Sequence, residues 1–317
     1  MLDSINTNII FPHLGIELKN VASGINVFGY RIAFYGIAIG IGMLLGWLIC
    51  EWMAKKTGQN AEIYLDFALV AIFFSVIGAR VYYVVFDWKE FADDPLSVFN
   101  LRTGGLAIYG GIIAAVITAL IYTKVKKYSF WLLADTSCIG LITGQIIGRW
   151  GNFFNREAFG QYTDGLFAMQ LDRRVVSNIY QSSVSVSKLK EIYAGKEEAL
   201  KNILEIRNHT VMIKGVEYIQ VHPTFLYEAA WNICLLIFLI IYTKHKKFDG
   251  EIILCYLAGY GFGRVWVEGL RTDQLFLWGT PFAVSQLFSA FLFISAMIII
   301  IIKRRKGKRS KGRMRRR

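Results

Sequence analysis

The sequence predicts an all-α integral membrane protein with seven transmembrane helices, its amino terminus outside and its carboxyl terminus in the cytoplasm. Of the 317 residues, 55% are hydrophobic, and the apolar residues gather in long runs. A helix needs roughly 20 mostly apolar residues to cross a bilayer, so each such run is a candidate span. The seven runs cover residues 31–52, 63–86, 104–123, 131–148, 224–242, 251–269 and 282–302.

Basic residues in the short loops predict the orientation. Lysines follow the first, third and fifth runs, whereas the connection 87–103 is mainly acidic. Because Lys and Arg accumulate in cytoplasmic loops, all the basic connections fall on one side of the membrane. The tail 303–317 lies on that side with 11 Lys or Arg, which leaves about +2 of the net charge of +13 for the remaining residues. The tail is either an orientation signal or a contact for anionic membrane lipids, and the charge does not indicate a nucleic-acid partner.

One long connection is expected to form a small domain outside the membrane. It contains strand-capable stretches at 167–171 and 211–213, and the pattern of 188–207 is typical of a charged amphipathic helix. The amino-terminal residues lack the pattern of a cleavable signal peptide. The expected parts are an extracytoplasmic amino-terminal segment (1–30), helices one to four (31–148), a signature loop and extracytoplasmic head domain (149–223), helices five to seven (224–302) and a basic cytoplasmic tail (303–317).

A polar cluster marks the end of the fourth run. Arg149, Asn152, Asn155 and Glu157 lie within residues 148–160, where the chain is expected to leave the bilayer. Charged groups at a membrane mouth are costly to desolvate, so such clusters usually mark a pathway or a reaction site. The predicted topology brings further polar groups from other helices to the same outer depth. They are Tyr35, Arg80, Tyr109, His222, Tyr227, Glu228, Arg264 and Glu268.

Each of these groups also has a purely structural explanation. Arg264 and Glu268 are four residues apart, which suits an intrahelical ion pair. Arg80 is placed to snorkel to the interface, and His222 to cap a helix. The tyrosines fit an aromatic belt. A merely structural bundle, however, has no reason to stack three arginines and three glutamates at one level, so the joint pattern favours a site.

Paired arginines at the level of the lipid headgroups suit a phosphate, which accepts forked hydrogen bonds from guanidinium groups. The sequence has no HExxH zinc motif, no GxSxG nucleophile elbow and no Walker loop. The outer cluster holds one histidine and no cysteine, which argues against zinc. The four cysteines all lie in predicted spans and are interpreted as small buried residues. We therefore expect positioning and acid–base chemistry on a phospholipid, with no metal and no cofactor.

Several ordered motifs on separate helices resemble those of a known family, the prolipoprotein diacylglyceryl transferases. In the signature region they are Gly148-Arg149, Gly151-Asn152-Phe153, Asn155, Glu157 and Gly160. In the first three spans they are Tyr35-Gly36, Arg80, Gly104-Gly105 and Gly110-Gly111. Further along the chain they are His222-Pro223, Leu226-Tyr227-Glu228, Tyr260-Gly261, Arg264, Glu268, Arg271 and Asp273.

The resemblance implies transfer of the diacylglyceryl group of phosphatidylglycerol to the lipobox cysteine of a prolipoprotein signal peptide. The product is a thioether, and glycerol phosphate leaves. It implies a multi-pass protein of the bacterial cytoplasmic membrane with its active site at the outer leaflet. The expected catalytic residues are Arg149, Arg264, Glu157, Tyr35 and Tyr109. The expected substrate-binding residues are Arg149, Asn152, Asn155, Gly160, Arg80, His222, Tyr227, Glu228, Glu268 and Arg271.

Our hypothesis gives the phosphate to Arg149 and Arg264, and lets the two asparagines orient the headgroup. Glu157, Glu228 or Glu268 would hold the arginines, and one of the three would take the thiol proton. Many family members carry histidine at the position of Tyr109. Since tyrosine ordinarily has a pKa near 10, this position either orients the substrate or leaves the role of base to another residue.

A rival interpretation is a transporter or lipid-binding membrane protein for an anionic substrate. Its support is a polar membrane interior with packing glycines. Transporters generally place their sites near the midplane between internal repeats, and this sequence shows no repeat and one outer cluster. An intramembrane protease would need a serine, a pair of aspartates or a zinc site, none of which fits the cluster.

Overall fold

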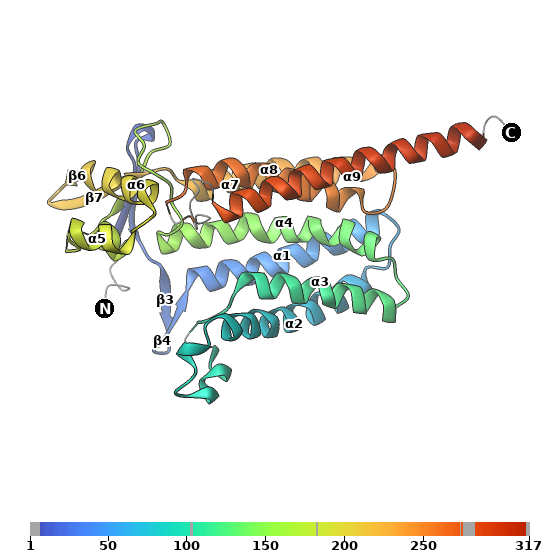
Figure 1. Ribbon diagram of the computed structural model, residues 1–317, viewed down its shortest axis with the longest axis horizontal. Coiled ribbons are helices and arrows are strands. Elements are labelled where there is room, and N and C mark those ends of the chain that lie inside the picture. The colour runs from blue at the N-terminus through green and yellow to red at the C-terminus, as the bar shows by residue number, and fades with distance from the viewer. Residues whose placement is uncertain (1–6, 102–103, 182, 273, 275–282, 315–317) are drawn as a thin grey trace. The chain divides into compact units, whose positions relative to one another are not determined.

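The computed structural model describes residues 7–101, 104–181, 183–272, 274 and 283–314 (Figure 1). Most of these residues are helical. The helices are α1 (Phe34–Lys56), α2 (Glu62–Phe86), α3 (Ile108–Val125), α4 (Phe130–Asn155), α5 (Val186–Ile192), α6 (Glu197–Asn208), α7 (Thr224–Tyr242), α8 (Glu251–Leu270) and α9 (Val284–Met314). The strands are β1 (Thr7–Phe11), β2 (Ile16–Val21), β3 (Gly24–Val27), β4 (Tyr30–Ala33), β5 (Met169–Asp172), β6 (Val211–Ile213) and β7 (Val216–Val221).

Within the described ranges, six helices are long and apolar enough to cross a membrane: α1, α2, α3, α4, the α7 segment and α9. This agrees with the predicted helical membrane protein. Helix α8 occupies the predicted span 251–269 but is not among the six. It carries three charged residues, Glu251, Arg264 and Glu268, among its 20 residues. Seven spans and their orientation therefore stay predictions, and residue 282, where the last span was expected to begin, lies outside the described residues.

Helix α4 runs further than the predicted span 131–148. The helix ends at Asn155. Phe153, in its last turn, packs into a buried apolar cluster, which extends the helix beyond the predicted span. Arg149 and Asn152 consequently lie on one helix, three residues apart, and share a face. Side chains that the sequence placed in a loop thus have fixed helical positions.

The amino-terminal residues form strands that the sequence analysis did not predict. Strands β2, β1, β5, β7 and β6 make one antiparallel sheet in that order, and β3 and β4 form a separate hairpin before α1. Ile9 of β1 pairs with Leu171 of β5, and Leu171 pairs with Ile219 of β7; all three side chains are fully buried. The sheet is therefore not confined to 149–223, because the segment 1–30 supplies two of its strands.

The single amphipathic helix expected at 188–207 is two helices. Ser185 accepts a hydrogen bond from the backbone of Lys188 and so caps the start of α5. Between α5 and α6, Gly195 has a φ of 75°, which breaks the helical path. Ile203 and Ile206 of α6 are fully buried in the same cluster as Ile9 and Phe153, so this pair of helices completes the core of the head domain.

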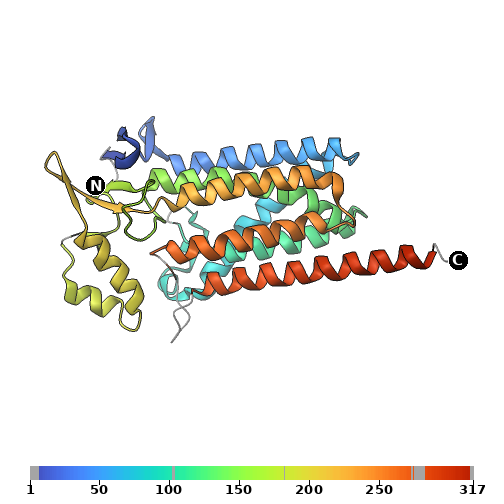
Figure 2. The ribbon, with the colours of Figure 1, turned by 90° about the horizontal axis from the view of Figure 1, so that it is seen from above.

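The chain divides into two compact units. The first comprises Met1–Leu45, Leu141–Lys247 and Leu254–Arg317, and the second comprises Gly46–Gly140 and Phe248–Ile253. In the first, α7, α8 and α9 lie side by side in both views (Figures 1 and 2). In the second, α2 and α3 pack so closely that a Cβ on Gly78 would lie 2.4 Å from that of Ala114.

Asp135 supports the second unit. Its carboxylate accepts hydrogen bonds from the backbone N–H groups of Gly250 and Ile253, at 2.9 and 3.0 Å. The first N–H groups of a helix have no partner within the helix, so Asp135 satisfies the start of α8 from a neighbouring helix.

Candidate functional site

The end of α4 folds back on itself. The N–H of Arg156 bonds to the carbonyl of Phe153 at 3.1 Å, and the N–H of Glu157 bonds to the carbonyl of Asn152 at 3.1 Å. This pair of bonds is a Schellman motif, with Arg156 in the left-handed region at a φ of 54°. The motif turns Glu157 back towards the helix. Its Oε1 accepts from the amides of Asn152 and Asn155, at 3.1 and 3.3 Å.

Arg156 is a residue that the sequence analysis missed. Its guanidinium is buried and donates to the carbonyls of Val21 and Phe154, at 2.5 and 3.0 Å. Burial lowers the pKa of Arg156, and the nearby Asp172 partly offsets that effect. The left-handed position usually favours glycine, so this arginine is held there by its contacts to the end of β2 and to its own helix. It secures the loop that carries Glu157.

Gly160 joins the signature loop to two other segments. Its N–H donates to the carbonyl of His222 at 2.9 Å, and it pairs with Arg271 as an isolated β-bridge. A Cβ at Gly160 would lie 2.7 Å from the Cβ of His222 and 2.8 Å from the carbonyl oxygen of Leu270. Glycine is required here by close backbone approach. Its predicted contact with substrate remains a prediction.

The arginines of α4 and α8 share one carboxylate. Glu228, at the start of α7, places Oε1 2.6 Å from Arg149 and Oε2 3.0 Å from Arg264. Its side chain is only 4% exposed. One of the three glutamates that the sequence proposed as holders therefore contacts both arginines. Residue spacing could not predict that Glu228 bridges the two arginines, because α4 and α7 are far apart in the sequence.

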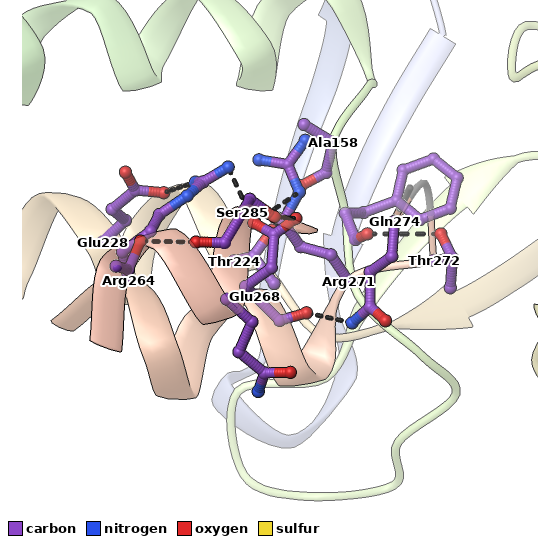
Figure 3. A network of polar contacts seen from close by, with 12 residues as sticks. Ala158, Thr224, Glu228, Arg264, Glu268, Arg271, Thr272, Gln274 and Ser285 are labelled. Carbon is purple, nitrogen blue, oxygen red and sulfur yellow. Dashed lines mark hydrogen bonds and ion pairs between the residues drawn. The ribbon is translucent and has the colours of Figure 1, made fainter. Parts of the chain in front are cut away.

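A second buried carboxylate extends the network (Figure 3). Glu268 lies 2.7 Å from Arg264 and 4.0 Å from Arg271, and accepts a hydrogen bond from Ser285 at 2.6 Å. Figure 3 shows Arg264 between Glu228 and Glu268. The predicted pair at 264 and 268 therefore exists, but as one link in a longer chain. Ser285, the second residue of α9, was not among the predicted site residues.

The arginines of the network are largely shielded from solvent and keep hydrogen-bond donors for a ligand. Arg149, Arg264 and Arg271 are 12–19% exposed at their side chains and face two buried carboxylates. A guanidinium has five N–H donors, so Arg149 and Arg264 keep donors that these contacts do not use. An anion that accepts several hydrogen bonds would complete the arrangement, and phosphate has the matching geometry.

Asn152 connects this network to the signature loop. Its Oδ1 accepts a hydrogen bond from Arg149 at 3.4 Å, while its amide donates to Glu157 at 3.1 Å. Glu157 is exposed and contacts neither Arg149 nor Arg264 among the contacts of the described residues. It therefore orients the asparagines, and the arginines are held by Glu228 and Glu268.

Three aromatic side chains lie on or against the segments that carry the network. The ring of Tyr35 packs on Gly151, where a Cβ would lie 2.4 Å from the ring. Nδ1 of His222 lies 3.1 Å from the hydroxyl of Tyr227. Burial lowers the pKa of His222 below its ordinary value of 6.5. In the described structure no side chain caps α7, so the capping role considered for His222 does not apply.

Arg80 and Tyr109 belong to the second unit. Arg80 is buried and its five N–H groups donate to backbone carbonyls between Ser97 and Gly105, at 2.7–3.1 Å. It does not reach a carboxylate in these contacts. Tyr109 lies in the first turn of α3 and is 56% exposed. The roles of Arg80 and Tyr109 towards the substrate stay predictions. Asp273, one of the residues that carry the family resemblance, lies outside the described residues.

Comparison with known proteins assigns the chain to a family. Residues 23–302 match the family described as prolipoprotein diacylglyceryl transferase. The chain belongs to this family. It is similar to proteins named phosphatidylglycerol–prolipoprotein diacylglyceryl transferase from Bacillus cytotoxicus, 36% identical over 300 residues, which are 93% of this chain and 96% of the relative. Relatives of the same name from Bacillus cereus and Bacillus anthracis are 36% identical over 287 residues, 89% of this chain and 92% of theirs.

Membership of the family and the apolar helices together make the chain a multi-pass membrane protein. The family resemblance found in the sequence is thereby confirmed. The match spans both units of the fold, from the hairpin before α1 to the apolar part of α9. It therefore includes all the residues of the arginine–glutamate network.

Proposed function

We propose that this chain transfers the diacylglyceryl group of phosphatidylglycerol to the thiol of a prolipoprotein lipobox cysteine. The cysteine sulfur attacks the glycerol carbon that carries the phosphate ester. The new bond is carbon–sulfur, and the bond that breaks is carbon–oxygen. Glycerol phosphate leaves with the electron pair of that bond. The names of the relatives give both substrates, phosphatidylglycerol and prolipoprotein.

The observation that supports this reaction is the arginine–glutamate network, in which Arg149 and Arg264 share Glu228 and keep further N–H donors. The leaving group gains negative charge as the carbon–oxygen bond breaks. Donors fixed in advance in a dry site stabilise such a developing charge, and losing one commonly costs 10²–10³-fold in rate. Arg149 and Arg264 would bind the phosphate through the donors that Glu228 leaves unused.

The thiol must also lose its proton. A free thiol with a pKa near 8.5 is only about 3% thiolate at pH 7, which corresponds to roughly 2 kcal/mol. Both oxygens of Glu228 face arginines, and the oxygens of Glu268 are engaged by Arg264, Arg271 and Ser285, so neither carboxylate presents an unengaged oxygen to the thiol. Glu157 uses one oxygen for the asparagine amides and is exposed, so we assign the proton to its second oxygen.

The reaction would take place at the outer leaflet of the bacterial cytoplasmic membrane. The network joins the carboxyl-terminal part of α4, the start of α7, the end of α8 and the start of α9. In the predicted topology these four positions lie at the extracytoplasmic end. The lysines after α7, by contrast, lie at the other end of that helix. Positive residues mark cytoplasmic ends, which supports this orientation.

Mass spectrometry of a lipobox peptide incubated with the purified protein and phosphatidylglycerol vesicles tests the proposal. We expect a mass gain equal to one diacylglyceryl group on the cysteine, with an equal amount of glycerol phosphate released. A peptide with serine in place of cysteine is the matched control and should gain nothing. Folded protein that modifies no peptide with any phosphatidylglycerol would refute the proposal. The transporter alternative is not favoured, because the family and its relatives are transferases.

A further inference from the structure

Asn232 is a fully buried amide within a candidate membrane span. It lies on α7, it is 0% exposed, and neither its Nδ2 nor its Oδ1 has a hydrogen-bond partner among the described residues. An unpaired amide in an apolar interior is costly. Asparagine in a membrane helix usually offsets this cost by bonding to a neighbouring helix, and Asn232 makes no such bond within the described structure. Helix packing therefore does not explain why an asparagine stands at this position.

Asn232 lies one turn beneath the arginine–glutamate network. It is four residues after Glu228, so the two side chains share the buried face of α7 in successive turns. Helical side chains lean towards the amino-terminal end of their helix, which aims the amide of Asn232 at Glu228. Oε1 of Glu228 is buried and lies 2.6 Å from Arg149, yet no N–H of the described residues meets it at a hydrogen-bonding angle. An unused donor is thus aimed at an acceptor that lacks a full hydrogen bond.

The neighbouring helices also carry polar side chains one turn beneath the network, and these have partners. Gln145 of α4 accepts a hydrogen bond from the hydroxyl of Tyr256 at 3.2 Å. Tyr260 of α8 stacks on Tyr256, with ring centroids 5.7 Å apart, and lies within hydrogen-bonding reach of Arg149. A polar layer therefore continues into the membrane below the network. Asn232 belongs to this layer but uses neither end of its amide in the contacts of the described chain.

We propose that Asn232 is a positioning residue, which receives Glu228 when Arg149 turns to the lipid phosphate. The inference rests on the proposed function and adds a residue to it. A phosphate that bonds to the unused donors of Arg149 draws this guanidinium away from Oε1 of Glu228. A buried carboxylate that loses a charged partner is costly. The amide N–H of Asn232 then donates to that oxygen and keeps Glu228 in place against Arg264.

This role predicts a particular kinetic pattern. The phosphate contacts of the arginines strengthen as the leaving group gains charge, so the amide is needed most in the transition state. An interaction of that kind affects kcat more than KM. A purely structural asparagine, by contrast, would lower the amount of folded protein and leave the kinetics of the folded fraction unchanged.

Asn232→Leu tests this role, because leucine keeps the branching of the side chain and has no polar atom. We expect kcat for diacylglyceryl transfer to fall roughly tenfold, about 1.4 kcal/mol, with KM for phosphatidylglycerol unchanged. Asn232→Ala needs no extra room and should give the same result, which covers a leucine variant that does not fold. Trp47→Phe is the matched control. It removes from α1, in the second unit, a buried N–H that has no partner among the described residues, and it should leave kcat unchanged.

A double-mutant cycle shows whether Asn232 acts through Glu228. Glu228→Gln removes the charge that the amide receives, so adding Asn232→Leu to it should cost no further rate. Losses that multiply in full would overturn the proposal, as would an unchanged kcat in both Asn232 variants or a loss confined to KM. None of these outcomes touches the proposed function, which fails only if the unaltered protein transfers nothing from any phosphatidylglycerol.

Discussion

Two arginines in this protein, the buried Arg80 and the partly buried Arg264, are held in opposite ways. Arg80 of the second unit donates its five N–H groups to five backbone carbonyls. Arg264 of the first unit lies between the carboxylates of Glu228 and Glu268, and these contacts use only part of its guanidinium. Both side chains were predicted to serve the same site, because both lie at the outer depth of their helices.

The difference lies in what each arginine can still bind. Carbonyls that use all five donors leave no N–H for a phosphate, so Arg80 organises its loop. Gly104 and Gly105 belong to that arrangement, since both have a positive φ and a Cβ on Gly105 would lie 2.3 Å from Nη1 of Arg80. Carboxylates fix Arg264 at two nitrogens and leave donors for a ligand. Whether an arginine can bind a phosphate therefore depends on how many of its N–H donors its protein partners already use. Its depth in the membrane alone does not decide this.

Lysine at Arg264 or Arg149 should produce the largest effect. Lysine keeps the charge but loses the planar fork, so it cannot contact a carboxylate and a phosphate in the same geometry. We expect kcat/KM for diacylglyceryl transfer to fall at least about 100-fold in each variant, with normal membrane insertion.

Arg174→Lys is the matched control, because Arg174 is an exposed head-domain arginine paired with Asp172. It should leave the rate unchanged. Near-normal turnover in both Arg149→Lys and Arg264→Lys would remove the arginines from the mechanism.

Glu228→Gln should have the next largest effect. The amide keeps the size of the side chain but removes the charge that holds Arg149 and Arg264 together. A hydrogen bond to a charged group contributes about 1.5–3 kcal/mol, so kcat should fall roughly 10- to 100-fold. The control is Glu217→Gln, which removes the partner of Arg173 in the head domain. Steady-state kinetics of both variants check this, and equal rates would show that the bridge is not needed for transfer.

Arg80→Lys separates the two kinds of arginine directly. An ammonium has three donors, so at least two of the five carbonyls lose their partner. We expect a loss of about 2 kcal/mol in the free energy of unfolding, with KM for phosphatidylglycerol unchanged in the folded fraction. Thermal unfolding in detergent and kinetics measure both. A raised KM with unchanged stability would instead restore Arg80 to the substrate-binding role that its depth in the sequence predicts.

The sequence could place Arg149, Glu228 and Arg264 at one depth, because apolar runs and loop charges predict which helix ends meet. It could not show that Glu228 joins both arginines, since that contact depends on how α4, α7 and α8 pack. The partners of Arg80 could not be predicted from the sequence. They are backbone carbonyls, which every residue type possesses, so no residue pattern indicates which ones Arg80 contacts.

The head domain shows the same limit. The stretches 167–171 and 211–213 were recognised as strand-capable and contribute to β5 and β6. Strands β1 and β2 were not, although Thr7–Phe11 alternates between buried and partly buried side chains. β2 pairs only with β1, and the pairing that places β1 in the sheet is with β5, more than a hundred residues away. Arg156 was missed for a related reason, because its left-handed backbone is a position where glycine is expected.

The smallest effect is expected at His222, beside the network rather than within it. Burial lowers its pKa, so the folded protein favours the neutral ring more than the unfolded chain does. Below pH 6.5 the unfolded chain therefore binds more protons. The contribution of His222 to the free energy of unfolding is complete above pH 6.5 and is lost as the pH falls towards the lowered pKa. The unfolding midpoint of the unaltered protein should thus fall more steeply between pH 6.5 and pH 5 than that of His222→Gln. Parallel curves would mean that His222 is as accessible to protons in the folded protein as in the unfolded chain, and that the edge of the site is open to water.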